Sequence, residues 1–203
     1  RHAGWIAAAA ELANDNENTY VHKILIPEIP FNEEAFLVGV QKDVEEFGYS
    51  VIVASEGLKN QNGEFYSASD KKDSFGHNQL GGLAPKLANL IDKNLKYKYH
   101  WSVSDYLQRS ARHISSKTDI EQAISVGKAA ANMALNNKNG FMPVICRDSN
   151  SPYSWSIRES ELIHIANKEK TVPANFISED GFRISQDGVD YLKPLTIGES
   201  YPK

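Results

Sequence analysis

The sequence has very little cysteine, no long hydrophobic run and no excess of positive charge. Its one cysteine, Cys146, excludes an internal disulfide framework and a cysteine-rich zinc site. The longest apolar run, residues 3–10, is far shorter than the ~20 residues that cross a bilayer. Lysine and arginine total 22 against 26 acidic residues, so no basic excess points to nucleic acid. The 203 residues, 41% of them hydrophobic, are enough for one large domain or two small lobes.

Several common catalytic motifs are also missing. The chain has no GxxxxGK[ST] phosphate loop, no GxGxxG and no GxSxG, and its 6 histidines form no HExxH pair. Cys146 lies at the end of an apolar run, with no histidine nearby in the sequence. We therefore interpret it as a buried structural thiol rather than a nucleophile.

The first part of the chain predicts an α/β fold. Residues 5–13 are rich in strong helix formers, and residues 21–26 are an apolar run of strand length. Asn32 followed by two acids predicts the start of a helix, and Gly48 predicts its end. Residues 49–54 predict a second strand. The order helix–strand–helix–strand favours a layered parallel sheet with flanking helices, whose ligands bind at the carboxyl ends of the strands.

The remaining elements are predicted from local patterns. Residues 60–76 are polar and predict an exposed loop, and residues 83–95 predict a helix with Pro85 in its first turn. Residues 96–103 alternate basic and aromatic side chains, which predicts a strand. Further strands are expected over residues 141–146 and 153–157.

A long helix is expected after Ser116, because Ser116 and Asp119 resemble a capping box. This helix has an apolar stripe of mostly small residues, which predicts close packing against a sheet. The stripe is formed by Ile120, Ala123, Ile124, Gly127, Ala130, Ala131, Ala134 and Leu135.

Glu28 is a candidate binding residue, because it directly follows the first predicted strand and is flanked by prolines. A rigid loop that holds a carboxylate at the carboxyl end of a strand suits hydroxyl recognition. An acid at the entry to the next helix is an equally good local interpretation. Arginine suits phosphate binding, although each basic side chain taken alone is more often a surface charge. The basic candidates near predicted element ends are Arg1, Arg109, Arg112 and His113.

Several motifs, in the same order, resemble the phosphofructokinase family. Residues 1–8 (RHAGWIAA) resemble the end of its Met-Gly-Arg-x-x-Gly motif, which opens a helix. Residues 24–28 (ILIPE) resemble its strand that ends in Pro-Glu, and residues 51–57 (VIVASEG) resemble its next strand. Later similarities lie within residues 75–82, 106–110 and 117–129, so the resemblance covers nearly the whole chain.

The pattern is most similar to the pyrophosphate-dependent bacterial members of that family. The ATP-dependent form usually reads Gly-His-x-Gln-Arg-Gly-Gly where this chain has residues 105–111 (DYLQRSA). Residues 141–147 and 153–157 also resemble the pyrophosphate-dependent group. The resemblance implies a phosphotransferase that converts fructose 6-phosphate and pyrophosphate, with Mg²⁺, to fructose 1,6-bisphosphate and phosphate. This reaction would be reversible and part of glycolysis.

The resemblance also implies roles for individual residues. Arg1 would lie beside the sugar and the transferring phosphoryl group and act as the catalytic residue. Glu28 would accept hydrogen bonds from sugar hydroxyls, and Arg109 would pair with a substrate phosphate. Tyr106 stands where the short enzymes carry a histidine near the 6-phosphate. The implied substrate-binding set, which contains no metal ligand, is Arg1, Glu28, Tyr106, Leu107, Gln108 and Arg109.

The chain begins with Arg1 rather than Met, and we expect it to be the C-terminal part of a longer protein. The family's Gly-Gly-Asp-Gly-like donor loop, its Thr-Ile-Asp-x-Asp-like segment with the catalytic base, and the Mg²⁺ ligands would then lie upstream. Residues 1–107 would form the sugar-phosphate-binding lobe, and residues 108–150 would return to the absent donor lobe. Residues 151–203 would form a C-terminal extension. We expect this chain alone to be inactive.

The resemblance further implies a cytoplasmic homo-oligomer that binds neither nucleic acid nor membrane. Lys98 and His100 are candidates for reaching the sugar phosphate of a neighbouring subunit. Two alternative functions stay open at this point. One is an ATP-dependent 6-phosphofructokinase, because this part of the chain says little about the donor. The other is a catalytically inactive module that binds a sugar phosphate.

Overall fold

The computed structural model describes residues 2–72, 78–80 and 82–202, and the chain divides into two compact units. Unit 1 joins the chain up to Ser104 with the later segment Lys170–Val189. Unit 2 joins Asp105–Glu169 with the chain from Asp190 onward. Residues 151–203 therefore contribute to both units.

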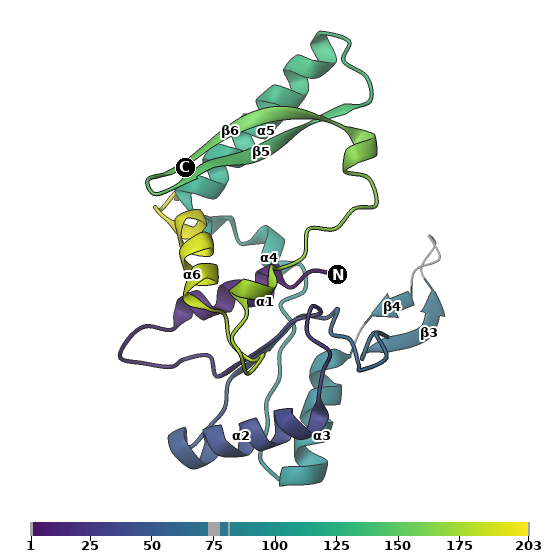
Figure 1. Cartoon of the computed structure of the whole chain (residues 1–203), viewed down its shortest axis with the longest axis vertical. Coiled ribbons are helices and arrows are strands. Elements are labelled where there is room, and N and C mark those ends of the chain that lie inside the picture. The colour runs from purple at the N-terminus through teal and green to yellow at the C-terminus, as the bar shows by residue number, and fades with distance from the viewer. Residues whose placement is uncertain (1, 73–77, 81, 203) are drawn as a thin grey trace. The chain divides into compact units, whose positions relative to one another are not determined.

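Unit 1 contains a parallel pair of strands, as the sequence predicts. Strand β1 (Lys23–Leu25) lies beside β2 (Ile52–Ala54), with Lys23 opposite Ile52 and Leu25 opposite Ala54. Helix α2 (Glu33–Phe47) connects the two strands (Figure 1). The predicted α/β class is thus confirmed.

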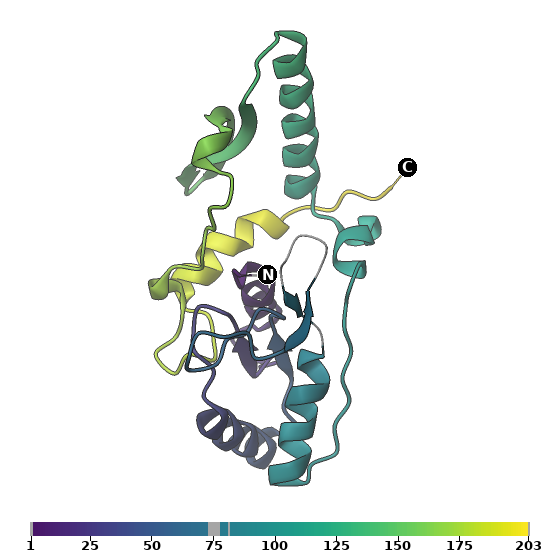
Figure 2. The same ribbon diagram turned by 90° about the vertical axis from the view of Figure 1, so that its right-hand side faces the viewer.

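The two ends of α2 lie where the sequence predicts them. The side-chain oxygen of Asn32 accepts a hydrogen bond from the Ala35 N–H at 3.0 Å and caps the first turn. Gly48 ends the helix with φ of 82°, in the left-handed region where glycine has no steric penalty. Helix α3 (Leu83–Leu95) also matches its prediction and lies beside α2 (Figure 2).

The core of unit 1 forms where α2, α3 and the strands meet. Phe36 of α2 is completely buried, and its ring lies 5.2 Å from that of Phe31. The buried cluster contains Leu25, Phe31, Phe36, Val40, Leu58, Leu83, Leu87 and Ile91.

The chain enters unit 1 through a short helix rather than one long α-helix. Helix α1 (Trp5–Ala8) continues as the tighter 3-10 helix η1 (Ala9–Ala13), so the predicted helix changes type after Ala8. Gly4 precedes α1, and a Cβ atom there would lie 2.5 Å from Cβ of Ile26. Only glycine allows this close approach of α1 to the chain that follows β1.

Two predictions for unit 1 are wrong. Residues 60–76 do not form only a loop, because β3 (Ala68–Lys72) pairs antiparallel with β4 (Asn78–Leu80); residues 73–76 lie outside the described part. Residues 96–103 form no strand, since no described segment pairs with them. Trp101 and Val103 are exposed there. An alternating pattern favours an extended backbone but supplies no neighbouring strand.

Unit 2 is built from a helix and a β-hairpin. Strands β5 (Phe141–Asn150) and β6 (Tyr153–Glu161) pair antiparallel, and α5 (Lys117–Leu135) packs along them (Figure 1). The Ser116 hydroxyl oxygen accepts a hydrogen bond from the Asp119 N–H at 3.0 Å, which confirms the predicted cap.

The face of α5 that packs on the hairpin is not the predicted stripe. The buried residues of α5 are Gln122 and Met133, and the Gln122 amide donates to the Tyr153 hydroxyl at 2.6 Å. In the predicted stripe, Ile124 and Leu135 are 52% and 81% exposed. The helix therefore buries a polar residue that has a hydrogen-bond partner, and every member of the apolar stripe except the half-buried Ile120 is exposed.

The remaining elements are short. No helix in the described part of the chain has both the length and the apolar composition to cross a bilayer. The short helices are α4 (Leu107–Ser110), η2 (Arg112–Ile114), η3 (Leu162–His164), η4 (Ala174–Phe176), α6 (Gln186–Leu192) and η5 (Lys193–Thr196).

His22 joins the starts of the two parallel strands through its neutral form. The Val51 backbone N–H donates to Nδ1 of the His22 ring at 3.1 Å, and the His22 backbone N–H donates to the Val51 carbonyl at 2.9 Å. The imidazole is buried between the rings of Phe47 and Tyr49. Burial lowers the pKa of His22 below its ordinary value, Lys23 and Arg183 lower it further, and Asp43 and Glu46 oppose them.

We predict that Phe36→Ala lowers the free energy of unfolding by about 3–5 kcal/mol, because it removes a fully buried ring and leaves a cavity. Val38→Ala is the matched control on α2, since Val38 is 64% exposed. The control change is expected to stay within about 0.5 kcal/mol. Urea unfolding followed by tryptophan fluorescence measures both, and equal losses would contradict this description of the core.

We predict that His22 makes the stability of unit 1 fall as pH falls below the ordinary histidine pKa of 6.5. The unfolded chain binds the proton more readily than the folded chain, so the stabilising contribution is present above 6.5 and is lost towards acid pH. His22→Gln keeps an acceptor but does not titrate, so it flattens this dependence between about pH 7.5 and 5.5. His164→Gln, at an exposed position, keeps the slope. An unchanged slope in His22→Gln would rule the assignment out.

Candidate functional site

Glu28 lies just beyond the carboxyl end of β1, after the buried Pro27, where the sequence predicts a binding carboxylate. Its side chain is half-buried. The Gly4 N–H donates to Oε1 at 3.0 Å and to Oε2 at 3.2 Å. The Val172 N–H donates to Oε1 at 2.9 Å. One carboxylate therefore holds two backbone segments that are far from it in the sequence.

The hydrogen bonds to Glu28 are unevenly divided between its two oxygens. Oε1 accepts hydrogen bonds from the N–H groups of both Gly4 and Val172. From the described residues, Oε2 accepts only one hydrogen bond, the longer one from Gly4. An ionised carboxylate has about four acceptor positions. Glu28 thus has the capacity to accept a ligand hydroxyl while it keeps its backbone partners.

Aromatic contacts fix the chain around α1. The ring of His2 stacks on Phe65 with centroids 5.2 Å apart, and Lys59 Nζ lies 5.8 Å from the Phe65 ring. The Trp5 indole N–H donates to the Lys170 carbonyl at 2.7 Å. Arg1, the predicted catalytic residue, lies outside the described residues.

Glu11, in the middle of η1, forms an ion pair with Arg183. Nε of Arg183 donates to both Glu11 oxygens at 2.8 and 3.1 Å, and Nη2 donates to Oε1 as well. The Ile184 N–H donates to Glu11 Oε2 at 3.2 Å. Burial alone would raise the pKa of Glu11, but the hydrogen bonds from Arg183, Asn14 and Ile184 lower it overall.

The other predicted substrate-binding residues are in unit 2. Tyr106 precedes α4 and Leu107 begins it, and their side chains are 69% and 68% exposed. Gln108 and Arg109 belong to the same helix, and their side chains lie outside what the structure describes. The Tyr106 carbonyl accepts a hydrogen bond from the Ser110 hydroxyl at 3.1 Å, which closes this turn.

The lesser candidates take different positions. Arg112 donates to the Ser200 carbonyl and, at 3.3 Å, to the Ser200 hydroxyl, so its guanidinium links two segments of unit 2. His113, Lys98 and His100 are exposed. Cys146 of β5 is free and only partly buried, which corrects the expectation of a buried thiol.

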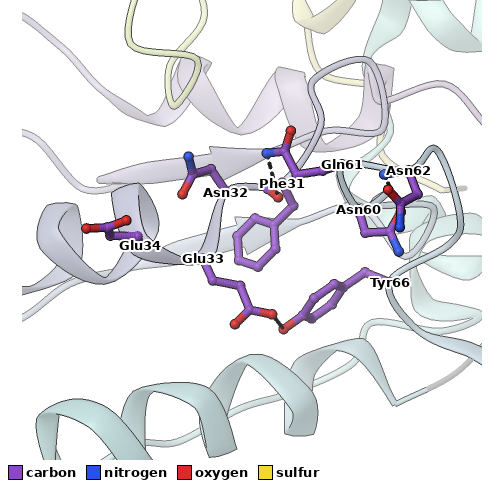
Figure 3. A pocket seen from close by; sticks show the side chains of 8 residues that line it. All are labelled: Phe31, Asn32, Glu33, Glu34, Asn60, Gln61, Asn62 and Tyr66. Atoms are coloured by element: carbon purple, nitrogen blue, oxygen red, sulfur yellow. Dashed lines mark hydrogen bonds between the residues drawn. The ribbon is translucent and has the colours of Figure 1, made fainter.

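A pocket of about 450 Å³ opens beside the start of α2 (Figure 3). The Tyr66 hydroxyl donates to Glu33 Oε1 at 2.7 Å, and the Gln61 amide donates to the Phe31 carbonyl at 3.2 Å. Burial and the hydrogen bond to Glu33 raise the pKa of Tyr66 well above its ordinary value. Polar groups of this pocket thus bond to one another. Its lining is Phe31, Asn32, Glu33, Glu34, Asn60, Gln61, Asn62 and Tyr66.

No metal site is present among the described residues, which contain no group of three or more His, Cys, Asp or Glu placed to hold an ion. The acidic side chains described above are instead hydrogen-bonded to backbone, tyrosine or arginine groups. The described part of the chain therefore offers no cluster of three or more protein ligands for Mg²⁺.

The sequence did not reveal the backbone partners of Glu28. Val172 is 144 residues away, in a stretch without strong periodicity, and no pattern in the sequence links it to Glu28. Gly4 carried a usable signal, because a glycine just before a helix marks a possible close approach of backbones. The glycine alone does not show which residue approaches it.

Comparison with known proteins places these features in a family. The family model described as Phosphofructokinase matches residues 1–134. Pyrophosphate–fructose 6-phosphate 1-phosphotransferases from Halomonas elongata and Methylococcus capsulatus are 49% and 51% identical over 202 residues. Each of these matches covers 100% of this chain and 48% of the relative.

A solved structure agrees with these relatives. The crystal structure of pyrophosphate-dependent phosphofructokinase from Marinobacter aquaeolei is 50% identical, with a TM-score of 0.83. That match covers 100% of this chain and 47% of the crystallised chain. The chain thus spans about half the length of the relatives it matches, and it belongs to the phosphofructokinase family.

Proposed function

We propose that the protein containing this chain transfers a phosphoryl group between pyrophosphate and O1 of fructose 6-phosphate. The products are fructose 1,6-bisphosphate and phosphate, and the reaction is reversible. The proposal rests on one observation: over its whole length, the chain has 49% and 51% sequence identity to two relatives that are named for this reaction. The position of Glu28 at the carboxyl end of β1 supports sugar binding by this half.

In this proposal the chain supplies the sugar-phosphate side of the reaction. Arg1 lies beside the transferring phosphoryl group, and Glu28 accepts hydrogen bonds from sugar hydroxyls. Arg109 pairs with a substrate phosphate, while Tyr106, Leu107 and Gln108 complete the substrate contacts. Residues 1–107 act as the sugar-phosphate-binding lobe, and residues 108–150 return to the donor lobe. Phosphoryl transfer needs positioning and positive charge more than covalent chemistry, which suits this residue set.

The groups that bind the donor are assigned to the other half of the enzyme. As the resemblance to the family implies, we place the Mg²⁺ ligands and the catalytic base outside this chain. Mg²⁺ bound with pyrophosphate neutralises part of the phosphate charge. The 203 residues alone are then inactive, and activity belongs to the complete protein.

The cellular setting follows from the same proposal. The enzyme acts in glycolysis in the cytoplasm and assembles as a homo-oligomer, without nucleic acid or membrane as partners. Lys98 and His100, which are exposed, are candidates for contact with the sugar phosphate of a neighbouring subunit.

The alternative functions differ in what they predict for the donor. An ATP-dependent kinase would share this sugar-binding half. A catalytically inactive module would bind the sugar phosphate and turn over neither donor. The relatives named above favour pyrophosphate over both alternatives.

We predict that the complete protein forms fructose 1,6-bisphosphate from fructose 6-phosphate and Mg²⁺ when pyrophosphate is supplied, and not when ATP replaces it. An assay coupled to bisphosphate formation measures both donors on one preparation. Turnover with ATP alone would transfer the assignment to the kinase. No turnover in a folded protein that binds fructose 6-phosphate would support the inactive module.

We predict that Glu28→Gln raises the KM for fructose 6-phosphate by roughly 10- to 100-fold, because a charged acceptor of sugar hydroxyls becomes neutral. The KM for pyrophosphate is expected to stay near its original value. Glu17→Gln is the matched control, an exposed carboxylate of the same unit. Unchanged kinetics in Glu28→Gln would show that this carboxylate does not bind the sugar.

A further inference from the structure

We propose that residues 170–184, here called the return segment, hold Glu28 in its binding position and that Arg183 is the positioning residue. This inference rests on the proposed function, because it concerns the carboxylate assigned to the sugar. The return segment belongs to unit 1, although the chain reaches it only after building most of unit 2. It also lies beyond residues 1–134, the part that the family model matches.

The return segment contacts the start of α1 and Glu28 together. The Val172 N–H donates to Glu28 Oε1 at 2.9 Å, beside the bond from the Gly4 N–H at 3.0 Å. The Lys170 carbonyl accepts the Trp5 indole N–H at 2.7 Å. Val172 is 4% exposed, so this end of the segment is packed into the unit.

The same segment is also bonded to the strand that leads to Glu28. The Ile24 N–H of β1 donates to the Phe182 carbonyl at 2.8 Å. Lys23 Nζ lies 5.7 Å from the Phe182 ring and bonds Asp43 at 2.7 Å. A shift of the return segment would therefore move β1 and the Gly4 contact together, and both determine where Glu28 lies.

Arg183 fixes the second end of the segment through a buried carboxylate. Glu11 is 6% exposed, and it accepts hydrogen bonds from the Arg183 guanidinium and the Ile184 N–H. A guanidinium that gives two bonds to one carboxylate is a strong and directional pair. Without Arg183 the Glu11 charge would be buried without a cationic partner, which strongly destabilises this arrangement.

Loss of Arg183 is therefore expected to act at a distance from the ligand. The released segment carries the Val172 N–H away from Glu28, and the carboxylate then loses one of its two backbone donors. Small misplacements of a binding group cost large factors in catalysis, because the interactions are directional. The effect should fall on the sugar phosphate and spare the donor.

The experiment uses the complete protein with Arg183→Met, Arg183→Lys and the double variant Glu11→Gln/Arg183→Met. We expect Arg183→Met to raise the KM for fructose 6-phosphate roughly 10-fold, with the KM for pyrophosphate unchanged. We expect Arg183→Lys to recover part of the loss, because it keeps the charge. Arg158→Met is the control, since it breaks an exposed ion pair with Asp148 in unit 2.

A second readout does not depend on turnover. Amide hydrogen exchange at Gly4 and Val172 should be faster in Arg183→Met than in Arg158→Met. The double variant removes the charge of Glu11 together with its partner, so no unpaired charge is buried. It can therefore replace Arg183→Met in the test if the single variant does not fold. A folded double variant with unchanged exchange at both amides and an unchanged KM for the sugar phosphate would overturn the proposal.

The two proposals fail in different ways. If the unaltered protein does not convert fructose 6-phosphate with either donor, the proposed function is wrong. Faster exchange at Gly4 and Val172 would then still support the positioning role of Arg183. If the unaltered protein is active but these amides and the sugar-phosphate KM do not respond, only the positioning role is wrong.

Discussion

The Glu28 carboxylate is the constraint on which unit 1 depends, because it joins three distant parts of the chain. It lies three residues after the end of β1, and it accepts hydrogen bonds from backbone N–H groups of Gly4, before α1, and of Val172, in the return segment. The backbone approaches so closely at Gly4 that a side chain there would meet Ile26 and Glu28 itself. Glu28, which is proposed to bind the sugar, therefore also holds parts of the fold together. Any substitution of Glu28 changes both roles, so its effects on affinity and on stability have to be measured separately.

Among the side chains of unit 1 that the structure describes, the buried charges Glu11, Lys23 and Asp43 each have a partner of opposite charge. Lys23 and Asp43, each with a side chain 10% exposed, bond each other, and the Ser50 hydroxyl also donates to Asp43. Glu11 has its own guanidinium. Breaking such a pair by removing one partner leaves an unpaired buried charge, which costs far more than the pair contributes. Within the unit, these pairs therefore connect β1 to α2 and η1 to the return segment.

Local sequence patterns correctly predicted the helix ends at which capping residues stand. Asn32 and Gly48 gave both ends of α2, and the capping residue Ser116 gave the start of α5. The predictions were wrong where the structure of a segment depends on a contact with another, distant segment. Residues 96–103 have the alternation of a strand but no described neighbour to pair with. On α5, Gln122 is polar and was not expected inside, yet the Tyr153 hydroxyl satisfies its amide.

In the candidate site, too, local features could be predicted from the sequence and long-range contacts could not. The position of Glu28 after a strand and between prolines makes it a candidate from the sequence alone, because strand ends and rigid loops are local features. Its bond to Val172 spans 144 residues and depends on the tertiary fold, so no local pattern contains it. The position of Arg183 opposite Glu11 is likewise visible only in three dimensions.

The discontinuity of unit 1 has a consequence for its synthesis on the ribosome. The return segment, which belongs to unit 1, is translated only after Asp105–Glu169. Until it emerges from the exit tunnel, Glu11 lacks its cationic partner and Glu28 lacks the Val172 donor. Nascent unit 1 must therefore remain incomplete while most of unit 2 is synthesised. A stalled or truncated chain that ends before residue 170 would expose this unfinished state to chaperones and proteases.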